Sequence, residues 1–382
     1  MHSQALGEPL LVVAGEASGD LHAARLLTQI RQLQPGVQAY GLGSDELAQA
    51  GMEVVADSSE ISVVGITEVA RILPRARQIF RQLLEEVDRR RTRAAILVDF
   101  PDFNLRLAKQ LSRRGVRVLY YISPQVWAWR RGRVRTIRRW IDRMMVILPF
   151  EVEFYERHGV EVAYVGHPLV DEVPQLPQAW DEKSEAVTLH IALLPGSRLS
   201  EIESNLPAIL GASVRLASAR TCRFSLIKAS SVPLAVLEAY LQQAPGLDLD
   251  VVTADRFHAI ARAHLAICAS GTATLEVGLL GTPMVVVYRV SPWTYGLGRL
   301  LVRLPSIALV NLVLGSSVVP ELLQGAAAPE PIAAVCNKLL SNRDRIRQMR
   351  EGLAALRPAL GDSGASRRAA EAVVAYLSNH SS

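Results

Sequence analysis

The segment Asp99-Phe100-Pro101-Asp102-Phe103-Asn104 places two carboxylates directly after an apolar run. A carboxylate beside aromatic rings is partly desolvated, which raises its pKa and allows it to take a proton from a hydroxyl group. We therefore predict that Asp99 acts as a general base. An alternative role stays open for Asp102 and Asn104, because either side chain could cap a helix that begins here.

Two later segments have the composition of anion-binding loops. In Leu194-Pro195-Gly196-Ser197-Arg198, the backbone N–H groups of Gly196 and Ser197 and the guanidinium of Arg198 would fit a diphosphate. The segment from Ala269 to Glu276 repeats the pattern, and Glu276 could bind a ribose hydroxyl. The alternatives are a turn without a ligand in the first segment, and helix capping by Ser270 or Thr272 in the second.

A third small-residue loop, Gly15-Glu16-Ala17-Ser18-Gly19-Asp20, follows the first apolar run of the chain. Its backbone amides and the N-terminus of the following helix could hold an anion. The loop matches neither the dinucleotide fingerprint nor the Walker pattern. Ser18 or Asp20 could instead cap the helix.

Aromatic and basic residues gather in the segment that begins at Ser123. Trp127 and Trp129 precede seven arginines within fourteen residues, and 38 of the 42 basic residues of the chain are arginine. Indole rings suit sugar and acyl surfaces, and guanidinium groups suit phosphates. The alternative is that the tryptophans fill the core and the arginines form a solvated helix face. Without a recognisable binding module, a single basic helix is a weak signal for nucleic acid, and we expect no nucleic-acid partner.

The candidate residues need strands and helices to position them. Short apolar runs alternate with segments of helical period, which predicts an α/β fold with parallel sheets. The alternation pauses at the proline-rich stretch 169–190, so we expect two doubly wound Rossmann-like domains, 1–168 and 191–345, facing a cleft across a linker. Residues 346–382 should form C-terminal helices that pack back across the domains. Ligands of such folds bind at the carboxyl ends of the strands.

Composition excludes several classes of protein. Of the 382 residues, 49% are hydrophobic and 21% are charged, as in globular proteins, and three dispersed cysteines indicate neither a disulfide framework nor a metal site. The longest uncharged run, 304–320, is too short and too polar for a membrane span. No cationic segment precedes the first apolar run, so we expect a cytoplasmic protein without a secretory signal.

The stretch from Ile61 to Phe80 could contact a membrane surface. Its apolar residues are interspersed with Arg71, Arg75 and Arg77, and a basic amphipathic helix favours anionic lipid interfaces. The alternative is a helix that packs on the core and solvates its arginines.

Taken in order, these motifs resemble lipid-A-disaccharide synthases. The resemblance spans nearly the whole chain, because other segments also match in order: Gly65-Ile66-Thr67-Glu68-Val69, Leu148-Pro149-Phe150-Glu151, Gly166-His167-Pro168 and Pro320-Glu321-Leu322-Leu323-Gln324. It implies a GT-B glycosyltransferase that joins UDP-2,3-diacylglucosamine to 2,3-diacylglucosamine 1-phosphate (lipid X). The products would be UDP and the β-1,6-linked disaccharide of lipid A.

The resemblance also implies roles for residues. Asp99 would deprotonate the acceptor hydroxyl. The UDP side would comprise Gly196, Ser197, Arg198, Ser270, Gly271, Thr272, Glu276, Asn311, Glu321 and Gln324. The acceptor side would comprise Glu16, Ser18, Gly19, Asp20, Asp102, Asn104, Ser123, Trp127 and Trp129. No metal or other cofactor is expected, because Arg198, loop amides and a helix dipole can stabilise the leaving UDP.

Since both substrates carry acyl chains, we expect peripheral association with the anionic inner-membrane surface. Whether the chain forms a homodimer stays open. Two rival functions remain: a nucleotide-sugar transferase or epimerase that acts on soluble sugars, and an RNA- or lipid-binding module without catalysis.

Overall fold

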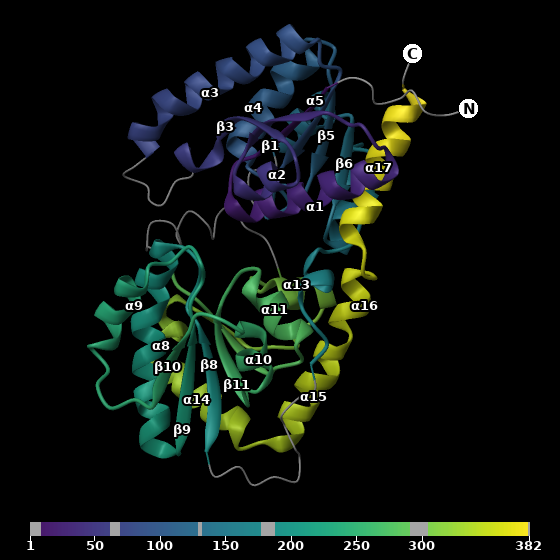
Figure 1. The fold of residues 1–382 in the computed structure, drawn as a ribbon. Coiled ribbons are helices and arrows are strands. Elements are labelled where there is room, and N and C mark those ends of the chain that lie inside the picture. The colour runs from purple at the N-terminus through teal and green to yellow at the C-terminus, as the bar shows by residue number, and fades with distance from the viewer. Residues whose placement is uncertain (1–8, 62–68, 129–131, 177–187, 291–304, 381–382) are drawn as a thin grey trace. The chain divides into compact units, whose positions relative to one another are not determined.

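The computed structural model describes residues 9–61, 69–128, 132–176, 188–290 and 305–380. The chain forms two compact units, each built around one parallel sheet (Figure 1). The first unit comprises Met1–Pro168 and Leu360–Ser382, and the second comprises Leu169–Ala359.

The first unit contains a seven-stranded sheet of order β3-β2-β1-β4-β5-β6-β7. Its strands are β1 (Leu10–Ala14), β2 (Ala39–Gly43), β3 (Glu53–Asp57), β4 (Ala94–Val98), β5 (Arg117–Tyr121), β6 (Arg143–Val146) and β7 (Val162–Tyr164). Its helices are α1 (Ala17–Leu33), α2 (Asp45–Gln49), the 3-10 helix η1 (Ser58–Glu60), α3 (Val69–Arg90), α4 (Pro101–Ser112), α5 (Arg133–Trp140), α6 (Pro149–Glu156) and α17 (Ala365–Asn379).

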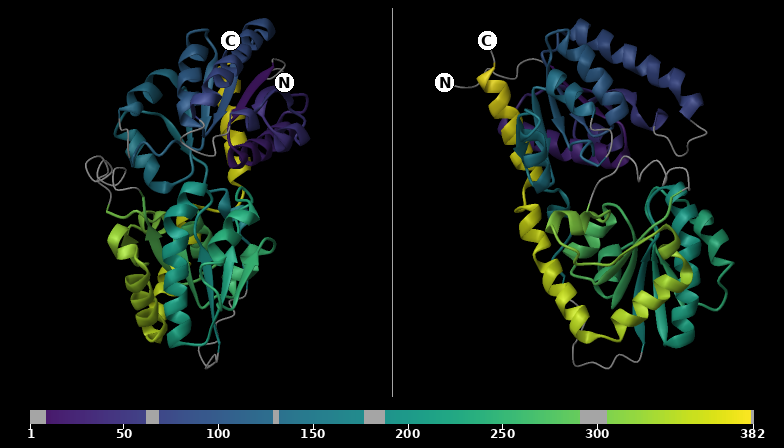
Figure 2. Two further views of the ribbon diagram at one scale, coloured as in Figure 1. Left: turned by 90° about the vertical axis from the view of Figure 1, so that its left-hand side faces the viewer. Right: turned by 180° about the vertical axis from the view of Figure 1, so that it is seen from behind.

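Alternate side chains of β1 enter two hydrophobic cores, one on each face of this sheet. Leu11 and Val13 pack with residues of α3, α4 and α5. Leu10 and Val12 pack with residues of α1, α2 and α17. A strand that is buried on both faces must be apolar at every position, which explains the uninterrupted apolar run of β1. The C-terminal helix α17, yellow in Figures 1 and 2, lies against α1 and completes the second of these cores.

The second unit contains a six-stranded sheet of order β10-β9-β8-β11-β12-β13. Its strands are β8 (Leu189–Leu194), β9 (Cys222–Ile227), β10 (Leu249–Val252), β11 (Leu265–Ala269), β12 (Met284–Tyr288) and β13 (Glu321–Leu323). Its helices are α7 (Leu169–Glu172), α8 (Leu199–Ala219), α9 (Leu234–Leu241), α10 (Arg256–Ala261), α11 (Ala273–Leu279), α13 (Leu309–Leu314), the 3-10 helix η3 (Gln324–Ala327), α14 (Pro329–Leu340) and α15 (Arg343–Ala354), while α16 (Leu356–Leu360) ends on the first residue of the returning segment.

The strand order of each sheet reverses at one point. In the first unit β1 pairs with β4, so that Ala14 lies opposite Val98 at the carboxyl ends. In the second unit β8 pairs with β11, so that Leu194 lies opposite Cys268. The connections leave such a pair in opposite directions and open a crevice between the two loops. The candidate loops after β1, β4, β8 and β11 therefore meet in pairs, one pair in each unit.

The structure confirms the α/β class and differs from the sequence prediction in detail. The alternation of apolar runs does not mark β2 and β3, because two glycines interrupt the apolar run of β2 and both ends of β3 carry an acidic residue. The strand β13 has only three residues, too few to stand out as an apolar run. The segment expected as a linker begins with helix α7. The boundary expected at residue 345 falls inside α15, and the compact units separate instead after Ala359.

None of the helices in the described ranges is both long enough and apolar enough to cross a bilayer.

Gly41 offers a test of the β1–β2 contact. Its φ is +151°, and a Cβ at this position would lie 2.0 Å from the carbonyl oxygen of Val12 on β1. We expect Gly41→Ala to lower the free energy of unfolding by about 3 kcal/mol, the upper end of overpacking costs, as measured by urea denaturation.

Gly115→Ala is the matched control for Gly41→Ala. Gly115 has a φ of +76°, but nothing lies within 4 Å of a Cβ there. This substitution should cost only about 1 kcal/mol of backbone strain. Equal costs for the two variants would contradict the role of close strand packing at Gly41.

Candidate functional site

The turn after β4 holds Asp99 in a strained conformation. Asp99 and Phe100 are both left-handed, with φ of 45° and 47°. The backbone N–H of Asp99 donates to the carbonyl oxygen of Tyr121 at 3.0 Å. The Asp99 carbonyl oxygen accepts hydrogen bonds from the Tyr120 hydroxyl and, at 2.8 Å, from Nδ2 of Asn104. A strained backbone conformation persists where contacts with the surrounding structure hold it in place, and such strain is typical of functional sites.

Phe100 joins this turn to the loop after β1. A Cβ on Gly15 would lie 2.1 Å from Cδ1 of Phe100, so the ring packs directly on the Gly15 backbone. Phe100 also stacks on Phe103 at 5.5 Å between ring centroids. The half-buried Asp99 thus stands beside the loop after β1, as the reversal of strand order requires.

Residues of the loop after β1 divide into exposed and buried positions. Glu16 is the N-cap of α1 and is half-buried, Ser18 is exposed, and Gly19 is buried. Asp20 is fully buried, and its carboxylate accepts hydrogen bonds from the backbone N–H and the hydroxyl of Ser44, both at 2.7 Å. Asp20 therefore anchors the start of α2. Neither Ser18 nor Asp20 caps α1.

Asp102 and Asn104 lie in the first turn of α4 but do not cap it, since the N-cap is Phe100 and no side chain bonds there. The exposed carboxylate of Asp102 forms an ion pair with Arg133 on α5. Asn104 is fully buried and donates to the carbonyl oxygens of Val98 and Asp99 at 3.1 and 2.8 Å. Asn104 therefore holds the end of β4, and Asp102 remains accessible.

The loop after β5 begins with a left-handed Ile122, whose φ is 62°. Its candidate side chains are buried. Ser123 lies 2.6 Å from the Tyr155 hydroxyl, and the indole N–H of Trp127 donates to Oε1 of Glu151 at 3.1 Å. Trp127 is 5% exposed and so fills the core, the alternative left open by the sequence. Trp129 lies outside the described residues.

Glu151 is a buried carboxyl group that was not predicted as a site residue, although it ends the Leu148–Glu151 motif. Burial raises its pKa to about 7, against the opposing effect of hydrogen bonds from Leu148, Trp127 and Ser123. Its own sequence signal was the Pro-Phe-Glu start of a helix, where a glutamate at the third position commonly accepts the N-cap N–H.

In the second unit, the loop after β8 surrounds the carboxylate of Glu201, which lies in the first turn of α8. The backbone N–H groups of Ser197 and Arg198 donate to Oε2 of Glu201 at 2.8 and 3.3 Å, and Nη1 of Arg198 lies 3.3 Å from Oε1. Gly196 has a φ of +123°, and a Cβ there would lie 2.6 Å from Glu201. The loop therefore has the geometry that holds an oxyanion, and the Arg198 side chain is 68% exposed.

The loop after β11 leaves its small residues accessible. Gly271 has no atom within 4 Å of a Cβ position, and Thr272 is the exposed N-cap of α11 without a side-chain cap bond. The Ser270 hydroxyl donates to the carbonyl oxygen of Ile307 at 3.0 Å, so it does not cap α11 either. Glu276 lies 3.3 Å from Arg256, and burial raises the pKa of its carboxyl group.

Asn311 and Glu321 come together and continue the network of Ser270. Glu321 accepts from the Ile307 N–H at 2.8 Å and from Nδ2 of Asn311 at 2.7 Å. Oδ1 of Asn311 accepts from the backbone N–H of Val319 at 3.0 Å. Both side chains thus shape the segments around them. Gln324 has a φ of 50°. Its Oε1 accepts the backbone N–H of Val290, and its Nε2 donates to the carbonyl oxygen of Val290.

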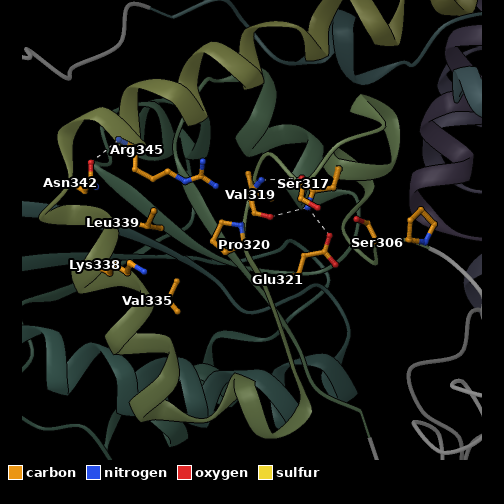
Figure 3. A pocket seen from close by; sticks show the side chains of 12 residues that line it. Ser306, Ser317, Val319, Pro320, Glu321, Val335, Lys338, Leu339, Asn342 and Arg345 are labelled. Carbon is orange, nitrogen blue, oxygen red and sulfur yellow. Dashed lines mark hydrogen bonds between the residues drawn. The ribbon is translucent and has the colours of Figure 1, made fainter.

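A cavity of about 660 Å³ lies beside this network in the second unit. In Figure 3, Glu321 lies on the side of Ser306, and the cationic side chains of Lys338 and Arg345 lie on the other side with Val335 and Leu339. The cavity shares Asn311 and Glu321 with the predicted UDP side, whereas Gly196, Ser197, Arg198 and Glu276 do not line it.

Potential metal ligands are dispersed in the described part of the chain, where no three His, Cys, Asp or Glu side chains gather into a candidate metal site. One Asp-x-Asp string, Asp248 to Asp250, lies at the start of β10, and both carboxylates contact Arg223. Because the strands are parallel, this string lies at the amino edge of the sheet, opposite the candidate loops.

Comparison with known structures identifies the fold. A UDP co-structure of Staphylococcus aureus MnaA is similar with a TM-score of 0.66, at 11% identity over 98% of both chains. Acinetobacter baumannii MurG is similar with a TM-score of 0.58, at 14% identity over 96% of this chain and 99% of MurG. The calicheamicin glycosyltransferase CalG4 is similar with a TM-score of 0.59, at 16% identity over 97% of this chain and 98% of CalG4. These similarities confirm the predicted GT-B fold.

Comparison with known sequences identifies the family. The sequence model of the lipid-A-disaccharide synthetase family matches residues 10–375. Lipid-A-disaccharide synthase of Anaeromyxobacter dehalogenans is 43% identical over 381 residues, which cover 99% of this chain and all of that protein. The lipid-A-disaccharide synthase of Myxococcus xanthus is 44% identical over 96% of this chain and 97% of that protein. The resemblance seen in the motifs is confirmed: the chain belongs to the lipid-A-disaccharide synthase family and is an enzyme of lipid A biosynthesis.

Proposed function

We propose that this enzyme transfers 2,3-diacylglucosamine from UDP to the 6-hydroxyl of 2,3-diacylglucosamine 1-phosphate, with inversion at the anomeric carbon. The observation that carries the proposal is the strained, half-buried Asp99 at the point where the strand order of the first unit reverses. Family membership supports the substrate class, because the relatives are named for the lipid A disaccharide.

Asp99 is the proposed general base. A β-linked product from an α-linked nucleotide sugar requires one inversion, and therefore one in-line displacement without a covalent intermediate. The acceptor hydroxyl would give its proton to Asp99 as its oxygen bonds to the anomeric carbon. The bond from that carbon to the UDP oxygen would break, and UDP would leave with the electron pair. Exposed Ser18 and half-buried Glu16 are candidate contacts for the acceptor.

The loop after β8 is the proposed diphosphate site. Two backbone N–H groups and the guanidinium of Arg198 already converge on the Glu201 carboxylate, which supports the idea that this loop stabilises negative charge. The exposed loop at Gly271 and Thr272 and the carboxyl group of Glu276 would contact the rest of the nucleotide. We propose that these groups stabilise the leaving UDP without a metal ion.

We also propose that the enzyme works as a peripheral protein at an anionic membrane surface. Much of the segment predicted to contact lipid, 62–68, lies outside the described residues. In the described part, Ile79 packs in the core of the first unit, while Leu73 is 39% exposed and Arg77 is exposed on the same helix. The exposed end of α3 would supply one apolar side chain and cationic neighbours to the interface.

A direct assay tests the reaction. UDP release should require both UDP-2,3-diacylglucosamine and 2,3-diacylglucosamine 1-phosphate, and Asp99→Asn should lower kcat by about 10³-fold because the base is lost. UDP affinity, measured by calorimetry, should stay unchanged. Asp88→Asn, which removes an exposed carboxylate on α3, should keep full activity. Turnover with a soluble sugar acceptor alone, or full activity of Asp99→Asn, would contradict the proposal.

Arg198 provides the second test. Replacing it with alanine should raise the Kd for UDP by about 10- to 100-fold, because a charge-assisted hydrogen bond contributes about 1.5–3 kcal/mol. Arg215→Ala removes an exposed guanidinium from α8, the helix that follows Arg198, and should leave the Kd unchanged. A UDP affinity that is equal in both variants would remove Arg198 from the diphosphate site.

Membrane association has its own test. The protein should co-sediment with vesicles of anionic phospholipid at low salt and dissociate as salt rises, because surface charges are screened. Leu73→Ser with Arg77→Ser should weaken the binding. Failure of the parent protein to bind the vesicles at low salt would end this part of the proposal.

A further inference from the structure

Glu151 stands out in the first unit as a carboxyl group that the proposed chemistry does not use. It is the third residue of α6, and Oε2 accepts from the backbone N–H groups of Leu148 and Ile147 at 3.0 and 3.3 Å. Glu151 is buried, with only 1% of its surface exposed. Burying a carboxylate costs several kcal/mol unless its hydrogen bonds compensate, so capping alone is a poor reason for this position.

The capping role of Glu151 can be compared with that of Glu201 in the second unit. Glu201 is the third residue of α8 and accepts the N–H of its N-cap residue in the same way, yet its side chain is 30% exposed. A glutamate can therefore cap a helix here while keeping contact with water. What distinguishes Glu151 is its other oxygen, Oε1, which accepts the indole N–H of Trp127 at 3.1 Å.

Three side-chain contacts tie the loop after β5 to α6, beside the backbone hydrogen bond of Ile122 to Met145 on β6. Glu151 holds Trp127, the ring of Phe150 packs edge-on to Trp127 at 4.8 Å between centroids, and the Tyr155 hydroxyl bonds Ser123 at 2.6 Å. The loop needs anchors because Ile122 is a β-branched residue in the left-handed region, which is costly.

The anchored loop begins beside Asp99. The residue before Ile122 is Tyr121, whose carbonyl oxygen accepts the Asp99 N–H at 3.0 Å, and the hydroxyl of Tyr120 bonds the Asp99 carbonyl oxygen. A shift of the loop would therefore disturb the backbone that holds Asp99. A misplacement of about 1 Å at a reacting group can lower the rate about 100-fold.

We infer that Glu151 is a positioning residue for the reaction: it ties Trp127 and the loop after β5 to α6 and thereby sets the geometry of Asp99. This inference rests on the proposed role of Asp99 as the base. Glu151 does not touch the reacting atoms and exchanges no proton with them.

Glu151→Gln tests the inference. The amide keeps the shape and one acceptor for Trp127, but its NH₂ group cannot accept from Leu148 and Ile147. We expect kcat to fall about 10- to 100-fold, with the KM for the UDP-sugar within about twofold of the parent, because the donor loops belong to the other unit. Glu153→Gln is the matched control on α6, since its carboxylate is 69% exposed and pairs with Arg157, and it should leave both parameters unchanged.

Amide hydrogen exchange supplies a readout that does not depend on activity. Residues 122–128 should exchange faster in Glu151→Gln than in the parent, while residues 196–201 should not change. Trp127→Phe, which removes the N–H donor, should reproduce the fall in kcat, and the double variant should lose no more than the larger single effect. If Glu151→Gln does not fold, Trp127→Phe alone carries the test.

Parental kcat and parental exchange at 122–128 in either variant would overturn the inference, as would a loss of UDP affinity that matches the loss of kcat. If instead the parent protein released no UDP from the two lipid substrates, the proposed function would fail, and the exchange data would still decide whether Glu151 holds the loop.

Discussion

The parallel pairing of β1 with β4, and of β8 with β11, is the constraint on which the arrangement of both candidate loop pairs depends. Parallel strands end at one edge of their sheet, and the connections diverge where the strand order reverses. Phe100 can pack on the Gly15 backbone only because these two loops leave the sheet side by side. The loops after β8 and β11 share the same relation in the second unit.

Polar side chains near these loops fall into two groups that differ in burial. Asp20, Asn104 and Asn311 are buried, and their amide or carboxylate groups bond the backbone of neighbouring segments. Ser18 and Arg198 are exposed and keep polar groups accessible. An unpaired buried polar group is costly, so the hydrogen bonds of the first group serve the fold, whereas the second group keeps its polar atoms accessible to a ligand.

The fold by itself does not select among the activities found on it. A protein solved with UDP and two glycosyltransferase structures share the GT-B architecture with this chain at 11–16% identity. The proposed function therefore rests on residues at the strand ends, such as the turn at Asp99 and the loop at Arg198. Those residues occur in the order of the motifs that identify the lipid-A-disaccharide synthase family, and the family match extends from residue 10 to residue 375.

The sequence by itself determined the alternation of strands and helices, the identity of the loops at the strand ends and the family. Hydrophobic period and turn composition are local properties, so they could be recognised in segments such as 10–20 and 94–104. Only the tertiary structure decided the partner of each polar side chain. Asp20 bonds Ser44, and Trp127 bonds Glu151, in each case 24 residues further along the chain. Burial and hydrogen bonding of a side chain depend on which segments the fold brings beside it, and a local pattern carries no record of that neighbour.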